Sequence, residues 1–112
     1  MLLLANVSND YKQKFQLLTE DNKSFLFKLE FIENQQSWFF SLTYNNLSIN
    51  NKRLITSPNF LRQFQNILPF GMSCITDDGS EPFEIDDFSK ERVKLYILTS
   101  GEVQTMETSV YA

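Results

Sequence analysis

The chain of 112 residues contains no histidine and a single cysteine, Cys74. The missing histidine removes the commonest general base, the usual nucleophilic triads and the common zinc sites. One cysteine cannot form an intrachain disulfide, and its S-C-I-T setting is typical of a small residue in a strand. We therefore expect a buried, unreactive thiol, in keeping with a reducing compartment.

Basic residues and long apolar runs are also scarce. Ten Lys and Arg stand against fourteen Asp and Glu, a formal net charge of −4, whereas a nucleic-acid-binding protein usually carries a basic face that displaces counterions from phosphate. The apolar start, residues 1–5, is far too short to span a bilayer, and no basic segment precedes it. These features predict a soluble intracellular product with no membrane segment and no nucleic-acid partner.

Phenylalanine, in contrast, is abundant, with 11 residues against 3 Gly and 3 Pro. Aromatic residues favour pleated, half-buried surfaces, so this composition favours β-sheet. Hydrophobic residues make up 42% and charged residues 21% of the chain, which is ordinary for one globular domain with a single core. The sequence thus predicts a folded, β-rich domain rather than a disordered chain.

The densest aromatic stretch runs from Lys23 to Tyr44 and predicts a β-hairpin. Apolar residues alternate with other residues in two runs, which the polar loop 33–36 separates. Because successive side chains of a strand point to opposite faces, the alternating apolar residues of each run share one face. The residues expected on this buried face are Phe25, Phe27, Leu29, Phe31, Trp38, Phe40, Leu42 and Tyr44.

A different pattern follows this hairpin and predicts the one helix of the chain, at about 58–66. The apolar residues that recur at helical spacing are Phe60, Leu61, Phe64 and Ile67. Ser57 can cap the backbone, and Pro58 suits the first helical position, where its missing N–H costs nothing. Pro69 and Gly71 end the pattern. We expect the apolar stripe of this helix to cover one end or face of the sheet.

The remaining segments predict further strands at 2–7, 14–18, 47–55, 72–76 and 92–99. Asn45–Asn46 is expected to be a two-residue hairpin loop, and Asn50–Asn51 a bulge or a further turn. Residues 1–100 then form one β-rich domain, and 101–112 form a polar C-terminal tail or an added edge strand. The predicted fold class is mainly β: an antiparallel β-sandwich or small barrel of about six to seven strands with one short α-helix.

The second face of the aromatic hairpin carries Leu26, Ile32 and Phe39. These side chains are more apolar than a solvated face requires. We expect this face to lie either under the helix around residues 60–64 or against another subunit.

The only dense group of candidate functional residues is acidic. Its members are Asp77, Asp78, Glu81, Glu84, Asp86 and Asp87. Carboxylates gathered in a loop can bind Ca²⁺ or Mg²⁺, and a divalent-metal enzyme built on the four Asp residues is one hypothesis. The spacing does not match an EF-hand loop, so an interpretation as turns and caps is favoured.

A second hypothesis is an oligonucleotide-binding-like β-barrel for single-stranded nucleic acid. It predicts that Trp38 or Phe39 is exposed beside Lys52 and Arg53, where an aromatic ring could stack on a base, and burial of both rings would exclude it. Core packing explains these aromatics better, because most charged residues near them are acidic or isolated. Ser57 has no base partner in the sequence and is better explained as a helix cap than as a nucleophile. The sequence therefore predicts no catalytic, cofactor-binding or metal-ligating residue.

The order of these segments resembles one known family over about residues 15–98. Its most specific elements here are L-P-F-G-M-S-C-I-T-D-D-G, the P-x-x-x-D-D-F loop and the closing R-V-K-L-Y-I-L strand. With the F-L-F-K-L-E-F and W-F-F-S-L strands before them, they are similar to the baseplate plug proteins of contractile-tailed phages, typified by a cyanophage baseplate plug. Asn pairs stand where that family often has Gly-rich turns, and the last dozen residues have no counterpart in it.

The resemblance implies a non-enzymatic structural protein of a phage or prophage tail baseplate that helps to close the tail tube. It implies no cofactor, and it implies partners among the baseplate hub or tail-tube proteins. Baseplate centres are symmetric, so a homo-oligomer in the assembled virion is also expected. The implied location is the tail baseplate of the virion, and the host cytoplasm before assembly.

Overall fold

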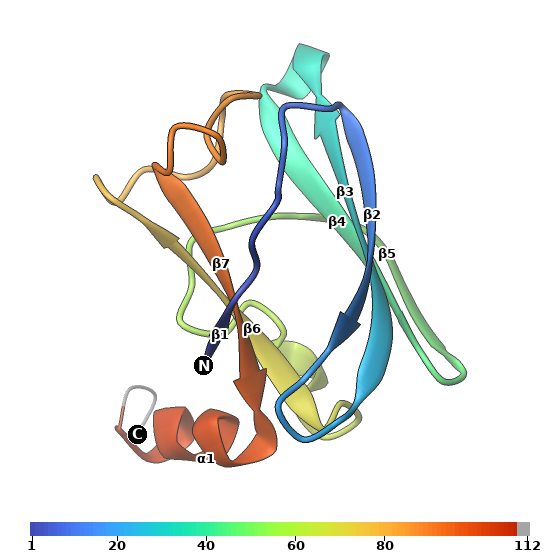
Figure 1. The fold of residues 1–112 in the computed structure, drawn as a ribbon. Coiled ribbons are helices and arrows are strands. Elements are labelled where there is room, and N and C mark those ends of the chain that lie inside the picture. The colour runs from blue at the N-terminus through green and yellow to red at the C-terminus, as the bar shows by residue number, and fades with distance from the viewer. Residues whose placement is uncertain (110–112) are drawn as a thin grey trace.

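The computed structural model describes residues 1–109, which form a sandwich of two antiparallel sheets (Figure 1). The elements are β1 (Leu2–Leu3), β2 (Lys12–Leu18), β3 (Ser24–Ile32), β4 (Ser37–Tyr44), β5 (Leu47–Arg53), β6 (Phe70–Thr76), β7 (Val93–Thr99) and α1 (Ser100–Ser109). One sheet has the order β2-β3-β4-β5 and the other β1-β7-β6. The predicted fold class is confirmed, and of its two alternatives the structure adopts the sandwich rather than the closed barrel.

The aromatic hairpin is the centre of the fold, as predicted. β3 and β4 pair with Phe27 opposite Leu42 and Phe31 opposite Trp38. Of the eight residues expected on the inner face, all are buried except Tyr44, which is half-buried. Phe25 stacks on Phe70 of β6 with ring centroids 4.2 Å apart, so the two sheets meet through aromatic rings.

Asparagine provides the unusual backbone angles that the expected turn and bulge require. Asn45 has φ 52° in the two-residue loop between β4 and β5, and this prediction is confirmed. Asn51 has φ 53° where the pairing of β4 with β5 shifts register between Phe40 and Leu42. Of the two alternatives for Asn50–Asn51, the structure therefore has the bulge.

The helix predicted at 58–66 is wrong. Residue 57 pairs with Cys74 at the free edge of β6, and the Phe60 N–H donates to the Met72 carbonyl, so the chain stays bonded to β6 where the helix should begin. The buried Asn59 side chain accepts the N–H groups of Leu61 and Met72. Only a short 3₁₀ helix, Arg62–Phe64, remains. Leu61 is still fully buried, but Ile67, which was expected on the apolar stripe, is 61% exposed.

The α-helix lies instead at the C-terminal end, where a tail or an edge strand was expected. Its start is a capping box: the Thr99 hydroxyl accepts the Glu102 N–H at 3.2 Å, and the Glu102 carboxylate accepts the Thr99 N–H at 3.0 Å. Val103 anchors the helix on β6, because an added Cβ at Gly71 would stand only 2.8 Å from the Val103 side chain. The expected edge strand is therefore wrong for Ser100–Ser109. The rest of the segment lies outside the described residues.

Candidate functional site

The acidic segment between β6 and β7 is organised around one arginine, Arg92. Its guanidinium donates to both carboxylate oxygens of Asp87 at 2.9 Å and to Asp78 at 2.7 Å. It also donates to the carbonyls of Ser80 and Glu81, which closes the loop around it. A two-pronged contact of this kind uses the fork geometry that arginine offers to a carboxylate.

Asp87 is fully buried and accepts two further hydrogen bonds, from the backbone N–H groups of Phe83 and Glu84 at 2.8 and 2.9 Å. Burial acts to raise the pKa of its carboxyl group. The Arg92 hydrogen bonds and the two N–H donors outweigh burial and hold this pKa below its ordinary value. Asp78 caps its own turn through the Ser80 N–H, which together with Arg92 lowers the pKa of Asp78. Both carboxylates accept backbone N–H groups, as the interpretation as turns and caps expected, but Asp87 is buried against Arg92 rather than solvated.

The structure does not bring together the four Asp residues of the metal hypothesis. One group of carboxylates does form, since oxygens of Glu84, Asp86 and Asp87 lie within 4.8 Å of one another. The Lys90 ammonium lies 2.8 Å from Glu84 and 3.4 Å from Asp86, while Arg92 holds Asp87. Each of these three carboxylates thus already has a positive side chain of the protein as its partner. Acidic groups with such partners are ordinary loop structure, and we assign no cation site here.

The thiol of Cys74 is buried in β6, as the sequence predicted. Burial is the main cause that raises its pKa to about 12. Because the thiolate is the nucleophilic form, this cysteine is not an activated residue.

The aromatic residues proposed to stack bases separate onto two faces. Trp38 is fully buried, and its indole N–H donates to the Glu84 carbonyl at 3.0 Å, which ties the hairpin to the acidic loop. Phe39 lies half-buried on the outer face of β4, opposite Arg53 of β5. The nucleic-acid hypothesis required either Trp38 or Phe39 to be exposed. Trp38 belongs to the core and does not meet this condition, so the half-buried Phe39 beside Arg53 is the one of the two that could contact a base.

The outer face of the β2–β5 sheet, with Leu26, Ile32 and Phe39, is not covered by the segment expected there. Phe60 packs against Phe40, with ring centroids 4.9 Å apart, and Phe40 belongs to the inner face. Of the two expectations for this surface, coverage by the residues near 60–64 is wrong. Within the described residues it stays partly open, and contact with another subunit remains a prediction.

A second surface, which sequence analysis missed, is apolar and lies on the outside of the β1-β7-β6 sheet. Register places Leu3 beside Tyr96 and Ile75 beside Lys94 on this face. Leu3 is 50% exposed, Ile75 is 46% exposed and Met1 is 49% exposed. Met1 and Ile75, together with Met106, line part of a hollow of about 370 Å³. We call this surface, defined by Met1, Leu3, Ile75, Tyr96 and Met106, the apolar face.

Its residues come from the N-terminal residue and four elements, β1, β6, β7 and α1, in three separate parts of the chain, so no local pattern could have identified it. Leu3 and Tyr96 become neighbours only when β1 pairs with β7 in the folded chain. Exposed apolar side chains that gather on one sheet face are typical of protein–protein contact surfaces. None of the helices within residues 1–109 has the length and apolar character that crossing a membrane requires.

Comparison with known families gives one match over most of the chain. A family model described as cyanophage baseplate Pam3 plug gp18 matches residues 3–100. This range contains all seven strands except the first residue of β1, and it ends at the first residue of α1. No curated protein matches the chain.

Proposed function

The chain belongs to the cyanophage baseplate plug family, and from this membership we propose that it is a non-enzymatic structural protein that helps to close the tail tube of a phage. Family membership supports the broader role, a structural component of the phage tail baseplate, and with it a location in the virion. We further propose that the protein helps to close the tail tube and that it is in the host cytoplasm before assembly.

The chemistry of the described residues agrees with a role without catalysis. The chain has no histidine, its cysteine is buried with a raised pKa, and four of its loop carboxylates, those of Asp78, Glu84, Asp86 and Asp87, pair with Arg92 or Lys90. Activated nucleophiles and general bases need the opposite conditions, a lowered thiol pKa or a base free to take a proton. These observations support a structural protein that acts through contacts with its neighbours.

The observation that carries the assembly role, beside the family match, is the apolar face. Met1, Leu3 and Ile75 are each about half exposed although they are large apolar side chains. Burying them against a neighbour removes apolar area from water, which stabilises the contact by roughly 25 cal/mol per Å². We assign this face to contact with the baseplate hub or a tail-tube protein.

The test uses the phage or prophage whose genome encodes this protein, with the substitution Ile75→Glu introduced into it. The tail particles that assemble are then purified. Ile75 faces outward beside Lys94, so a glutamate is tolerated by the fold while it places a charge in the apolar face. We expect tail particles that lack the protein by mass spectrometry and lack density on the tube axis by electron microscopy.

Ile67→Glu is the matched control, because Ile67 is 61% exposed and lies outside the apolar face. This variant should be incorporated like the natural protein. If natural protein is absent from purified baseplates, the proposed function is wrong; if Ile75→Glu is incorporated normally, only the assignment of the apolar face is wrong.

A further inference from the structure

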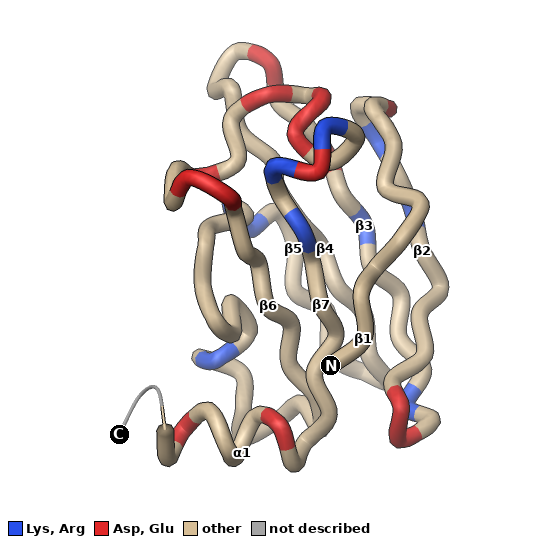
Figure 2. Tube along the Cα trace, turned by 60° about the vertical axis from the view of Figure 1, so that its left-hand side comes forward, with Lys and Arg blue, Asp and Glu red and all other residues tan. Residues whose placement is uncertain are grey.

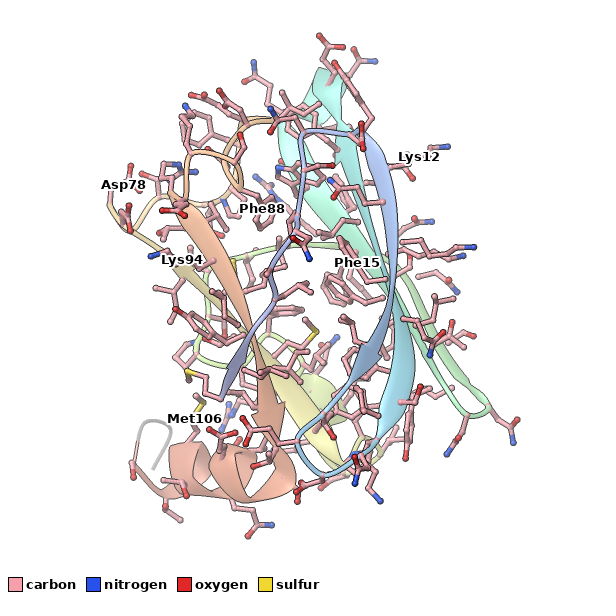
Figure 3. All side chains as sticks on the ribbon, viewed as in Figure 1. Lys12, Phe15, Asp78, Phe88, Lys94 and Met106 are labelled. Atoms are coloured by element: carbon pink, nitrogen blue, oxygen red, sulfur yellow. The ribbon has the colours of Figure 1, made fainter. Side chains whose placement is uncertain are left out.

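The outer face of the β2–β5 sheet concentrates positive charge, although the whole chain has a net charge of −4. The register of the strands places Lys12, Lys14, Lys28 and Arg53 on this side, all exposed. Glu30 is the one carboxylate among the outward positions of these four strands. We call this surface the basic face. Figure 3 shows Lys12 pointing away from the sandwich while Phe15 of the same strand points into it.

The charges of the basic face are not balanced within the described residues. Lys14 stands directly opposite Lys28 in the pairing of β2 with β3. Like charges at such positions destabilise a sheet. Neither lysine forms an ion pair with any carboxylate of residues 1–109. An anionic partner on this face would remove that repulsion.

The basic face is also concave. A hollow of about 400 Å³ lies over β2 to β5, and its lining includes the three lysines together with Phe39 and Ser41. Its lining has three lysines against one carboxylate, Glu30, together with a half-buried aromatic ring and the Ser41 hydroxyl, which accepts the Asn51 N–H. Such a surface suits a loop that carries carboxylates.

The chain itself contains a loop of that chemistry. Residues 77–92 carry seven Asp and Glu against one Lys and one Arg. Asp77 and Glu91 are exposed, and neither forms an ion pair within the described residues. Figure 2 shows the acidic residues gathered at the end of the molecule where β6 and β7 meet their loop. In Figure 3, Asp78 and Lys12 point to opposite sides of the sandwich, so this part of the loop faces away from the basic face of its own molecule.

We propose that the basic face binds the acidic loop 77–92 of a second copy of this chain, in a head-to-tail contact. Contacts of this kind join different surfaces of two copies and close into a ring when the rotation allows it. The inference rests on the proposed function in one respect, that several copies act together in the baseplate. Complementary charge would set the orientation of the contact and make it sensitive to salt.

Single-stranded nucleic acid is the other polyanion that a basic sheet face with an aromatic ring can bind. The observations favour a protein loop, because Trp38 is buried and only Phe39 is available for stacking. The acidic loop and the negative net charge would also repel a nucleic-acid strand.

The test compares self-association of three forms of the full chain by analytical ultracentrifugation. Lys14→Gln/Lys28→Gln neutralises the basic face, and Asp77→Asn/Glu91→Gln neutralises the loop without touching the Arg92 and Lys90 ion pairs. The natural protein should associate at low ionic strength and dissociate at about 0.5 M salt. Each variant alone should associate at least about tenfold more weakly.

An equal mixture of the two variants should again form a dimer, since one keeps its loop and the other keeps its basic face. Lys23→Gln/Lys94→Gln is the matched control: it removes the same charge outside the basic face and should associate like the natural protein. Lys14→Gln/Lys28→Gln should fold at least as stably as the natural protein, because it removes a repulsion.

Three results would overturn the inference: a natural protein that stays monomeric at low salt, a mixture that does not pair, or equal weakening by the control. Binding of a single-stranded oligonucleotide that Lys14→Gln/Lys28→Gln abolishes, without self-association, would assign the face to nucleic acid instead. A protein that is present in baseplates but never self-associates would refute this inference alone, whereas a protein that self-associates but is absent from baseplates would refute the proposed function.

Discussion

Asp87→Asn is the change that most directly tests whether the acidic loop is structural. The Asp87 carboxylate is fully buried and accepts four hydrogen bonds of 2.8 to 2.9 Å, two from Arg92 and two from backbone N–H groups. Asparagine keeps the shape of the side chain. It loses the charge, however, and it turns an NH₂ group toward donors in place of one accepting oxygen.

The expected cost follows from the surroundings of the pair. Removing one partner of a buried ion pair costs about 3–5 kcal/mol, because the other charge is left uncompensated. Arg92 keeps its contact with Asp78, and its side chain is 15% exposed. The loss should therefore lie at the lower end, about 3 kcal/mol of the free energy of unfolding. For a domain of this size that lowers Tm by roughly 10–15 °C.

Denaturant unfolding followed by tryptophan fluorescence measures this loss, since Trp38 bonds to the same loop through Glu84. Asp78→Asn is the matched control, because the Asp78 side chain is 54% exposed and water screens an exposed ion pair, so its loss should change stability little. A loss below about 1 kcal/mol for Asp87→Asn, or equal losses for both variants, would refute a structural role for the buried pair.

Three further predictions concern the two loop carboxylates, Gly71 and Cys74. The pKa values of Asp87 and Asp78 are lowered in the folded state. The two carboxylates therefore stabilise the folded protein fully above the unfolded Asp pKa of about 3.9, and this stabilisation is lost as the pH falls through their lower native pKa values. Acid unfolding measures the loss, and the free energy of unfolding of Asp87→Asn should depend less steeply on pH. Gly71→Ala should cost about 1–3 kcal/mol because its Cβ would stand 2.7 Å from the Asn59 Oδ1 and 2.8 Å from the Val103 Cγ2. Gly101→Ala should not destabilise, because its Cβ would meet only the Thr99 Oγ1, at an ordinary contact distance of 3.9 Å. Calorimetric scans of the two variants compare these costs. With its pKa raised to about 12, Cys74 should react with Ellman's reagent only after unfolding, and fast reaction of the native protein at neutral pH would contradict its burial.

The fold could be predicted where it depends on short-range chemistry. The apolar alternation of Phe25, Phe27 and Phe31 required a strand with one buried face, and the structure has it. Asn45 and Asn51 adopt positive φ because their side chains tolerate that backbone, so a turn and a bulge could be expected from residue type.

The helix was placed wrongly because a tertiary contact overrode one local pattern and a second local pattern was overlooked. Phe60, Leu61 and Phe64 do cover the core, but the free edge of β6 provides hydrogen bonds for residues 57–60 that a helix would have had to forgo. The T-x-x-E sequence of Thr99–Glu102 is a capping-box signature that could have revealed α1 from the sequence.

The surfaces proposed to carry function depend on distances that no local pattern contains. Phe39 and Arg53 face each other only because β4 and β5 pair in one register, and the apolar face needs Leu3 beside Tyr96. By itself, the sequence determined the aromatic hairpin, the Asn turns, the buried thiol and a chain without the usual catalytic groups, because these follow from residue type and from neighbours along the chain. The tertiary structure alone decided the Asp87–Arg92 pair, the docking of α1 and the grouping of lysines on one sheet face, because each depends on which strands pair and in which register.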